Sequence, residues 1–205
     1  EVQRVALSAT VRPVSVVADF VGGYTYRGSG EHAVYTPRPV AILEARDPKR
    51  LELQLRCPDS SRPVPEGFEA SKVFWRRLAD EILPDIRAAR STLIFANNRR
   101  TTEKLTRFLN EDAGTGQGSE IAWAHHGSLS RELRLAVEAR LKAGELDAIV
   151  ATNSLELGID VGALDQVVLV QTPPTVAAAV QRLGRAGHQV GAVSRGVLYP
   201  LGGRD

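Results

Sequence analysis

The chain has 205 residues, of which 43% are hydrophobic, so it can bury the core of one main domain plus an appendage. Its net charge of +2 is mild, and it has neither a run of eighteen apolar residues nor the layout of a signal peptide, which argues against a membrane or exported protein. Its one cysteine, Cys57, excludes an internal disulfide, which fits a reducing cytoplasm, and we interpret it as a structural residue.

The first part of the chain is irregular in pattern. Residues 4–10 (RVALSAT) are predicted to form a short apolar strand that ends in small hydroxyl residues. Pro13 then favours the start of a helix, which the glycine pair at 22–23 is expected to stop. Residues 24–66 are rich in Pro, Gly and charge, and only residues 51–57 (LELQLRC) show the alternation of a strand. We interpret this region as a connector that leads into a new sheet.

A regular alternation of helices and strands follows. Helices are predicted at residues 74–89, at residues 99–111, from Ser130 onward and at residues 175–186. Strands are predicted at residues 91–96, 120–125, 147–152, 166–171 and 195–200. Pro84 should kink or divide the first of these helices. The alternation indicates an α/β fold of three layers, in which a mainly parallel sheet is covered by helices on both faces. Ligands should therefore bind at the carboxyl ends of the strands.

Polar side chains follow three successive predicted strands at the points where the strands end. They are Asn97, Asn98 and Arg99, then His125, His126, Gly127 and Ser128, then Thr152, Asn153 and Ser154. Hydroxyls, amides and an arginine at one edge, together with backbone N–H groups at helix starts, are typical phosphate contacts that ignore base identity. The pattern suits a nucleic-acid backbone better than one small ligand. The alternative is a turn for the asparagines and helix capping for Ser128.

Two adjacent histidines, His125 and His126, raise the question of a metal site. At a strand end they should point to opposite sides, and neither CxxC nor HExxH spacing accompanies them, so we predict no metal. We expect one imidazole to pack inward and the other to lie near nucleic acid.

Arginines form two notable groups. Seven of them fall within residues 76–107. They could form either a phosphate-binding face or a solvated helix surface, and charge alone favours the solvated surface. The segment QRLGRAGH, residues 181–188, places Arg182 and Arg185 three residues apart, so on a helix they would share a face and could reach one anion. Guanidinium forks are well suited to gripping a phosphate. Two surface ion pairs would explain so tight a cluster poorly.

Five segments, in this order, resemble the motifs of superfamily-two helicases. They are SAT at 8–10, FANNRR at 95–100, HHGSLS at 125–130, ATNSLELGIDVG at 151–162 and QRLGRAGH at 181–188. Together they are most similar to the large helicase-related (Lhr) family of bacterial ATP-dependent DNA helicases. The segments are spread over nearly the whole chain, so the resemblance concerns its fold as well as single motifs.

The resemblance implies roles for individual residues. Ser8 and Thr10 would belong to the motif that links ATP hydrolysis to movement along the DNA strand, at the end of a first RecA-like domain. Without the resemblance, the two residues would be interpreted as the end of a β-strand and a helix cap. Contacts with the nucleic-acid backbone are implied for Asn97, Arg99, His126, Ser128 and Thr152.

The nucleotide side is assigned in the same way. Gly158 and Asp160 resemble residues that meet the nucleotide, with Asp160 accepting from a ribose hydroxyl, although a turn is the alternative. Arg185 resembles an arginine finger on the γ-phosphate. Arg182 would support it or pair with acidic groups across the cleft, and Gln181 completes the nucleotide-binding set.

An ATPase of this kind also needs a GxxxxGK[ST] loop and an acidic DExH or DEAD motif, and neither occurs in the 205 residues. We therefore expect ATP and Mg²⁺ to be held mainly by a first RecA-like domain that these residues lack, and no cofactor in this chain alone. Residues 1–30 would be the tail of that domain, residues 31–50 a connector, and residues 51–205 the second, C-terminal RecA-like domain.

The predicted function is thus the C-terminal domain of an ATP-dependent DNA helicase that translocates 3′ to 5′ as an intact enzyme. Its partners would be single-stranded DNA and the N-terminal RecA-like domain, in the cytoplasm at the bacterial nucleoid. Two alternatives stay open: an RNA helicase of the same superfamily, since readers of the 2′-hydroxyl are not evident, and a stand-alone nucleic-acid-binding regulatory module without ATPase activity. A small-molecule enzyme is less well supported, because no nucleophile and base pair occurs.

Overall fold

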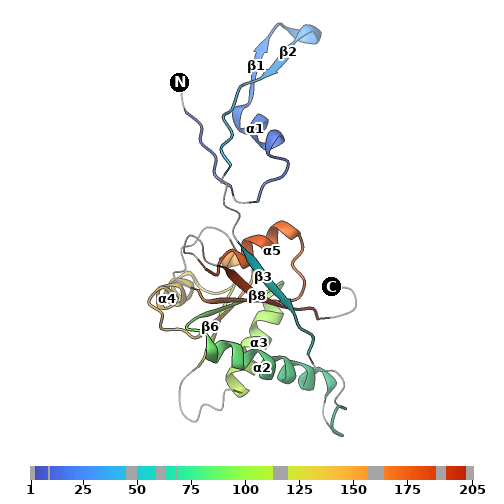
Figure 1. Cartoon of the computed structure of the whole chain (residues 1–205), viewed down its shortest axis with the longest axis vertical. Coiled ribbons are helices and arrows are strands. Elements are labelled where there is room, and N and C mark those ends of the chain that lie inside the picture. Colours follow the sequence, from blue (N-terminus) through green and yellow to red (C-terminus); the bar gives the residue numbers. More distant parts are fainter. Residues whose placement is uncertain are drawn as a thin grey trace. The chain divides into compact units, whose positions relative to one another are not determined.

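The computed structural model describes residues 3–8, 10–44, 50–58, 63–67, 69–112, 120–156, 164–187 and 193–201. The chain divides into two compact units, Glu1–Pro48 and Lys49–Asp205 (Figure 1). In the part of the chain described, no helix is both long and apolar enough to cross a membrane.

The first unit begins with one helix, α1 (Val14–Gly22). Pro13 precedes it and Gly23 ends it, with φ +66 and a backbone N–H that donates to the carbonyl of Asp19 at 2.8 Å. A left-handed φ is the conformation that glycine adopts most readily at a helix end, so the predicted helix and both its signals are confirmed.

A β-hairpin follows, in a region that we expected to be a connector without strands. Strands β1 (Tyr24–Arg27) and β2 (Val34–Pro37) pair antiparallel around the short 3-10 helix η1 (Gly30–His32). Gly28 has φ +102, and a Cβ there would meet the His32 carbonyl oxygen at 2.5 Å, so the turn requires glycine. Strands of four residues are too short to show a clear alternation, which is why the pattern did not reveal them.

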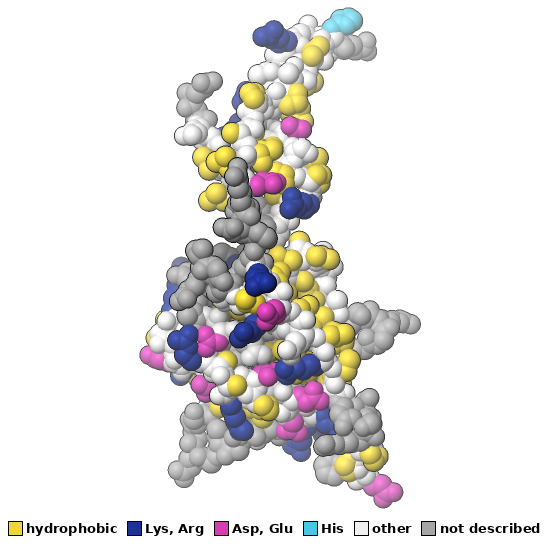
Figure 2. All heavy atoms as spheres, in the orientation of Figure 1, with side chains coloured by type: hydrophobic (Ala, Val, Ile, Leu, Met, Phe, Trp, Pro, Cys, Tyr) yellow, Lys and Arg dark blue, Asp and Glu magenta, His cyan; other side chains and the backbone are white. Residues whose placement is uncertain are grey.

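Residues 3–8 form no strand, so the strand predicted at 4–10 was wrong in its described part. A strand needs a neighbour for its backbone groups, and no described strand pairs with this segment. Its apolar side chains stay exposed, as Leu7 does at 93%. Helix α1 likewise buries none of its residues, and Phe20 is 84% exposed. Figure 2 shows hydrophobic side chains spread over the surface of this unit.

The second unit is built on a six-stranded sheet in the order β3-β8-β7-β4-β6-β5, and all neighbouring strands are parallel. The strands are β3 (Leu51–Leu55), β4 (Thr92–Ala96), β5 (Ala122–His125), β6 (Ala148–Ala151), β7 (Gln166–Val170) and β8 (Ser194–Tyr199). Each lies within a stretch predicted to be a strand or begins one residue from it. The predicted parallel sheet is confirmed.

Helices cover both faces of this sheet (Figure 1). They are α2 (Ala70–Ala88), α3 (Arg99–Asp112), α4 (Arg131–Lys142) and α5 (Val176–Leu183). Side chains alternate along the strands: Ile94 of β4 packs with α2 and α3, whereas Leu93 and Phe95 pack with α4 and α5. Three layers follow from this alternation, as predicted.

Helix α2 differs in detail from its prediction. It begins at Ala70 rather than at Phe74, and it continues through Pro84 without being divided. Proline removes one helical hydrogen bond, but Leu83 and Ile86 beside it are buried against the sheet. Burial of this apolar face compensates for the lost bond.

Candidate nucleotide and nucleic-acid interface

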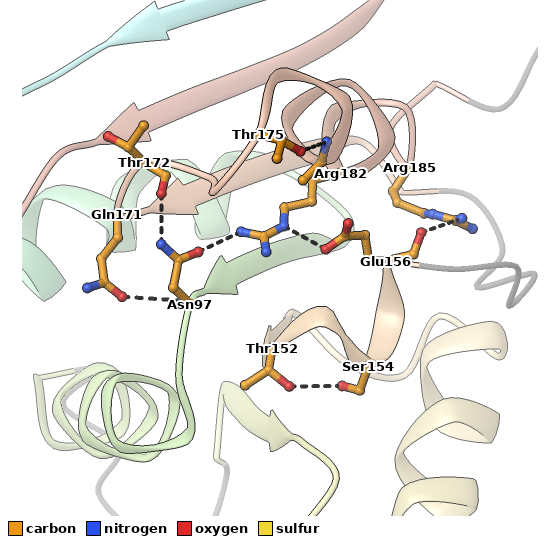
Figure 3. Close-up of polar contacts among 10 residues, drawn as sticks. Asn97, Thr152, Ser154, Glu156, Gln171, Thr172, Thr175, Arg182 and Arg185 are labelled. Atoms are coloured by element: carbon orange, nitrogen blue, oxygen red, sulfur yellow. Dashed lines mark hydrogen bonds and ion pairs between the residues drawn. The ribbon is translucent and has the colours of Figure 1, made fainter. Parts of the chain in front are cut away.

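Asn97 lies where the carboxyl ends of β4 and β7 meet. Its backbone N–H donates to Oε1 of Gln171 at 3.3 Å, and its Nδ2 donates to the carbonyl of Thr172 at 2.7 Å (Figure 3). Gln171 itself has φ +79, a conformation uncommon for a residue with a side chain, and its N–H donates to the Tyr199 carbonyl at 2.9 Å. Neighbouring strands thus fix this loop from both sides.

Arg182 is buried, with a side-chain exposure of only 3%. Its Nη1 donates to Oδ1 of Asn97 at 2.9 Å and its Nε to Oε2 of Glu156 at 3.1 Å, while the guanidinium lies 5.3 Å from the centre of the Phe95 ring. Arg182 was expected either to support the finger or to pair with acidic groups across the cleft. Its carboxylate partner is instead in the same domain, directly after the short helix η2 (Asn153–Leu155). The guanidinium is therefore held inside this domain.

Arg185 lies beyond the end of α5, in the turn that follows Gly184. The two arginines therefore do not share a helix face as predicted. Arg182 reaches the carboxylate of Glu156 from α5, and Nη2 of Arg185 donates to the backbone carbonyl of the same residue at 2.7 Å (Figure 3). Arg185 is only partly buried. Of the pair, it is the arginine nearer to solvent.

A second network joins the ends of β5 and β6. His125 Nδ1 lies 2.8 Å from Oγ of Ser154 and Nε2 lies 3.0 Å from Oε1 of Glu138 on α4. A neutral imidazole makes the carboxylate contact with Nε2–H as the donor. The Ser154 hydroxyl donates to the backbone carbonyl of His125 at 3.1 Å. Burial lowers the pKa of His125, although Glu138 acts in the opposite direction, so the neutral form is favoured. Thr152 is attached to this network through its Oγ1, which donates to Ser154 Oγ at 3.5 Å.

His126 is also buried, at 2% exposure, and its Nε2 lies 2.7 Å from Oε1 of Glu103 on α3. One imidazole was expected to pack inward, and His125 does so, but His126 is buried as well. Such burial does not fit a direct contact of the His126 side chain with nucleic acid. Each imidazole is hydrogen-bonded to a carboxylate inside the domain, Glu138 for His125 and Glu103 for His126. The spacing of residues in the sequence does not indicate these two partners.

Three of the other expected contact residues are accessible at this edge. Arg99 and Ser128 are exposed and Thr152 partly so. Among the described residues, neither Arg99 nor Ser128 has a side-chain hydrogen bond or ion pair. They come from the ends of β4, β5 and β6, which are adjacent in the sheet, so the strand order brings them together. Asn98 instead caps α3, since its Oδ1 accepts from the Thr101 N–H at 2.9 Å.

Some expected site residues do not lie with the groups described above. Gly158 and Asp160 lie outside the described residues. Ser8 and Thr10 belong to the first unit, where the Thr10 N–H contacts Ser8 Oγ at 3.5 Å. Gln181, on α5, is partly buried. In the described ranges no three His, Cys, Asp or Glu residues gather in a way that could hold a metal ion.

The sequence reasoning missed Glu156 and Gln171, which hold the two arginines and Asn97. A buried arginine needs a compensating acid, and Glu156, within the segment ATNSLELGIDVG, is that acid. For Gln171 the signal is weaker, because a glutamine at the end of a strand is common.

Residues 75–189 match the family model for the helicase conserved C-terminal domain. The Lhr helicase/probable uracil glycosylase of Mycolicibacterium smegmatis is 39% identical over 97% of this chain and 14% of its own length. The ATP-dependent helicase Lhr-Core protein 2 of Thermococcus barophilus is 39% identical over 97% of this chain and 21% of its own length. The chain therefore spans about a fifth or less of these relatives.

A solved structure, that of Mycobacterium smegmatis helicase Lhr bound to single-stranded DNA and AMP-PNP, is similar with a TM-score of 0.77 and 41% identity. The match covers 94% of this chain and 23% of that one. The C-terminal domain of the DEAD-box protein Dbp5 matches with a TM-score of 0.53 over 76% of this chain and 77% of its own, at 22% identity, a likeness in fold alone. The predicted RecA-like fold is thus confirmed.

Proposed function

Since this chain belongs to the Lhr helicase family and carries its helicase conserved C-terminal domain, we propose that it supplies the arginine finger and half of the single-stranded DNA track of an ATP-dependent DNA helicase. Its relatives are named ATP-dependent helicases, and the 205 residues contain no phosphate-cradling loop and no DExH motif. The ATP site would be completed by a first RecA-like domain.

One observation carries the assignment of the finger: the two arginines differ in burial and in partners. Arg182 is enclosed by Phe95, Asn97 and Glu156, so it orders the loops around it rather than reaching a ligand. Arg185, partly exposed beyond α5, is the one that can meet a γ-phosphate on a domain closing against this face. A guanidinium there stabilises charge on the transferring phosphoryl group.

Nucleic acid would run along the adjacent ends of β4, β6 and β5, on Arg99, Thr152 and Ser128. Asn97 and His126 would act as positioning residues, because both amide ends of Asn97 and the imidazole Nε2 of His126 are engaged within the domain. The Asn97–Arg182–Glu156 bridge then links the DNA edge to the nucleotide edge. Gly158 and Asp160 are proposed for the nucleotide side by resemblance alone.

Residues 1–30 are proposed to be the tail of the first RecA-like domain, with Ser8 and Thr10 coupling hydrolysis to movement. The exposed apolar side chains of the first unit support this, since Phe20 and Leu7 would be buried once that domain covers them.

The test is ATP hydrolysis, stimulated by single-stranded DNA, in the helicase that joins this chain to its first RecA-like domain. Arg185→Ala should lower kcat about a thousandfold while leaving the thermal unfolding temperature unchanged. Arg140→Ala on α4, a half-exposed arginine outside the motif, is the control and should keep wild-type kcat. Hydrolysis by Arg185→Ala within a few-fold of the control would overturn the assignment.

Substrate and polarity are tested in the same protein. Unwinding of duplexes with a 3′ tail of DNA, but not a 5′ tail, is expected for 3′ to 5′ movement. Faster unwinding of RNA duplexes than of DNA duplexes would favour the alternative, an RNA helicase.

A further inference from the structure

Helix α3 borders a hollow of about 810 Å³ in the described part of the surface. Its lining residues are Asn98, Arg99, Arg100, Glu103, Lys104 and Arg107. Five of the six belong to α3 and Asn98 directly precedes it, so one helix and the residue before it supply the whole lining.

The hollow carries a net positive charge. Four of its six lining residues are cations and one, Glu103, is a carboxylate. That carboxylate is already engaged, because Oε1 of Glu103 lies 2.7 Å from Nε2 of the buried His126. The single acid of the hollow therefore does little to satisfy the arginines and the lysine around it.

The four cations make few or weak interactions with other described side chains. Arg99 and Arg100 have no hydrogen-bond or ion-pair partner among the described residues. Arg107 pairs with Glu111 at 3.2 Å, but both side chains are exposed, and pairs of this kind are weak. The amine of Lys104 lies 5.1 Å from the centre of the Trp75 ring, which leaves its three N–H donors available.

The spacing of three cations is that of one helix face. Arg100, Lys104 and Arg107 stand at positions i, i+4 and i+7, so they form a row that we name the α3 stripe. At a rise of about 1.5 Å per residue the row is about 10 Å long. A row of separated charges matches successive phosphates of a strand better than one small anion, which would meet a single cation.

We infer that the α3 stripe binds the phosphates of a nucleic-acid strand and extends the track away from the ends of the sheet. This rests on the proposed function, because Arg99 belongs both to the hollow and to the sheet edge where the strand is proposed to run. Continuity through Arg99 is what favours nucleic acid over an acidic peptide. Contacts here would be with the backbone and indifferent to base identity.

The test is the salt dependence of binding to a 20-nucleotide oligo(dT), measured by fluorescence anisotropy on the 205-residue chain at several NaCl concentrations. For single strands the slope of log K against log salt changes by about 0.7 for each phosphate contact. The double variant Lys104→Gln/Arg107→Gln should therefore have a slope smaller by about 1.4 than that of the wild type.

The matched control is Arg140→Gln/Lys142→Gln on α4, which removes the same charge from the other side of the sheet and should keep the wild-type slope. An equal reduction in both double variants would mean a general charge effect and would overturn the inference. So would an unchanged slope in the α3 variant, or binding of polyglutamate in competition with oligo(dT). If Arg99→Ala and wild type both fail to bind oligo(dT), the proposed function fails instead.

Discussion

At the scale of single residues, we expect the two arginines of QRLGRAGH to have different roles: Arg182 stabilises the fold, and Arg185 acts in ATP hydrolysis. Arg182 has almost no exposed surface and neutralises Glu156 inside the domain. Removing one partner of a buried pair leaves the other charged and unpaired, which is costly. Arg185 is nearer to solvent, so its loss leaves no comparable buried charge.

We therefore expect Arg182→Ala to lower the free energy of unfolding by about 3 kcal/mol, since it orphans Glu156 and the Asn97 amide. Arg185→Ala should change it by less than about 0.5 kcal/mol. Urea unfolding of the two variants beside the wild type measures both values. Equal losses in the two variants would contradict the division between a structural and a catalytic arginine.

His125 gives the domain a pH dependence. Its pKa in the folded state lies below the ordinary value of 6.5, chiefly because of burial. Above pH 6.5 both folded and unfolded chains hold it neutral; below that value the unfolded chain takes up a proton first, so stability falls as pH falls.

Urea unfolding at pH 7.5 and pH 5.5 should show a larger loss of stability at low pH for the wild type than for His125→Gln, which cannot titrate. Comparison of the two chains cancels the contribution of all other groups. If the variant loses as much stability on acidification as the wild type, His125 is not the source.

At the scale of elements, α5 packs closely over β8, and Gly196 makes this possible. A Cβ on Gly196 would collide with Cδ2 of Leu183, near the end of α5. Since Arg182 precedes that leucine, the height of α5 above the sheet also sets the position of the arginine.

Gly196→Ala should therefore destabilise the domain by about 1–3 kcal/mol, as overpacking of a core does. Gly127→Ala, where nothing lies within 4 Å of the added Cβ, should unfold like the wild type. Differential scanning calorimetry of both variants checks this. A Gly196→Ala domain as stable as Gly127→Ala would show that α5 is not held tightly to the sheet.

Elements with a strong periodic pattern could be predicted from the sequence, and those that depend on distant partners could not. The apolar runs of β4, β6 and β7 predicted a buried parallel sheet, but they did not predict the order of its strands. The apolar stretch at residues 4–8 resembles a strand equally well but has no described strand beside it. The hairpin of β1 and β2 was missed because its strands are short and exposed.

The site shows the same limit. The motifs predicted a shared edge for Arg99, Ser128 and Thr152, and the strand order brings these three residues together. Arg185 was expected on a helix and lies in the turn beyond α5. Burial of His126 and Arg182 depends on Glu103 and Glu156, which lie 23 and 26 residues away along the chain. Side-chain pairing over such separations leaves no periodic signal in one sequence.

At the scale of the whole molecule, the second unit is a RecA-like domain with a six-stranded sheet in its described part, whereas the first unit presents uncovered apolar side chains. Its relatives are about five times as long or more. We propose that groups of the second unit bind phosphate, and among the described residues no three His, Cys, Asp or Glu side chains could hold a metal ion. A domain of this kind would work as one side of a closing cleft.

If this chain contributes one half of an ATP site, the rate of ATP hydrolysis depends on the first RecA-like domain. ATP hydrolysis in the presence of single-stranded DNA should be measured for the 205-residue chain alone and for the same chain joined to its first RecA-like domain. We expect no turnover by the chain alone and steady turnover by the joined protein. Hydrolysis of ATP by the purified 205-residue chain would contradict this expectation.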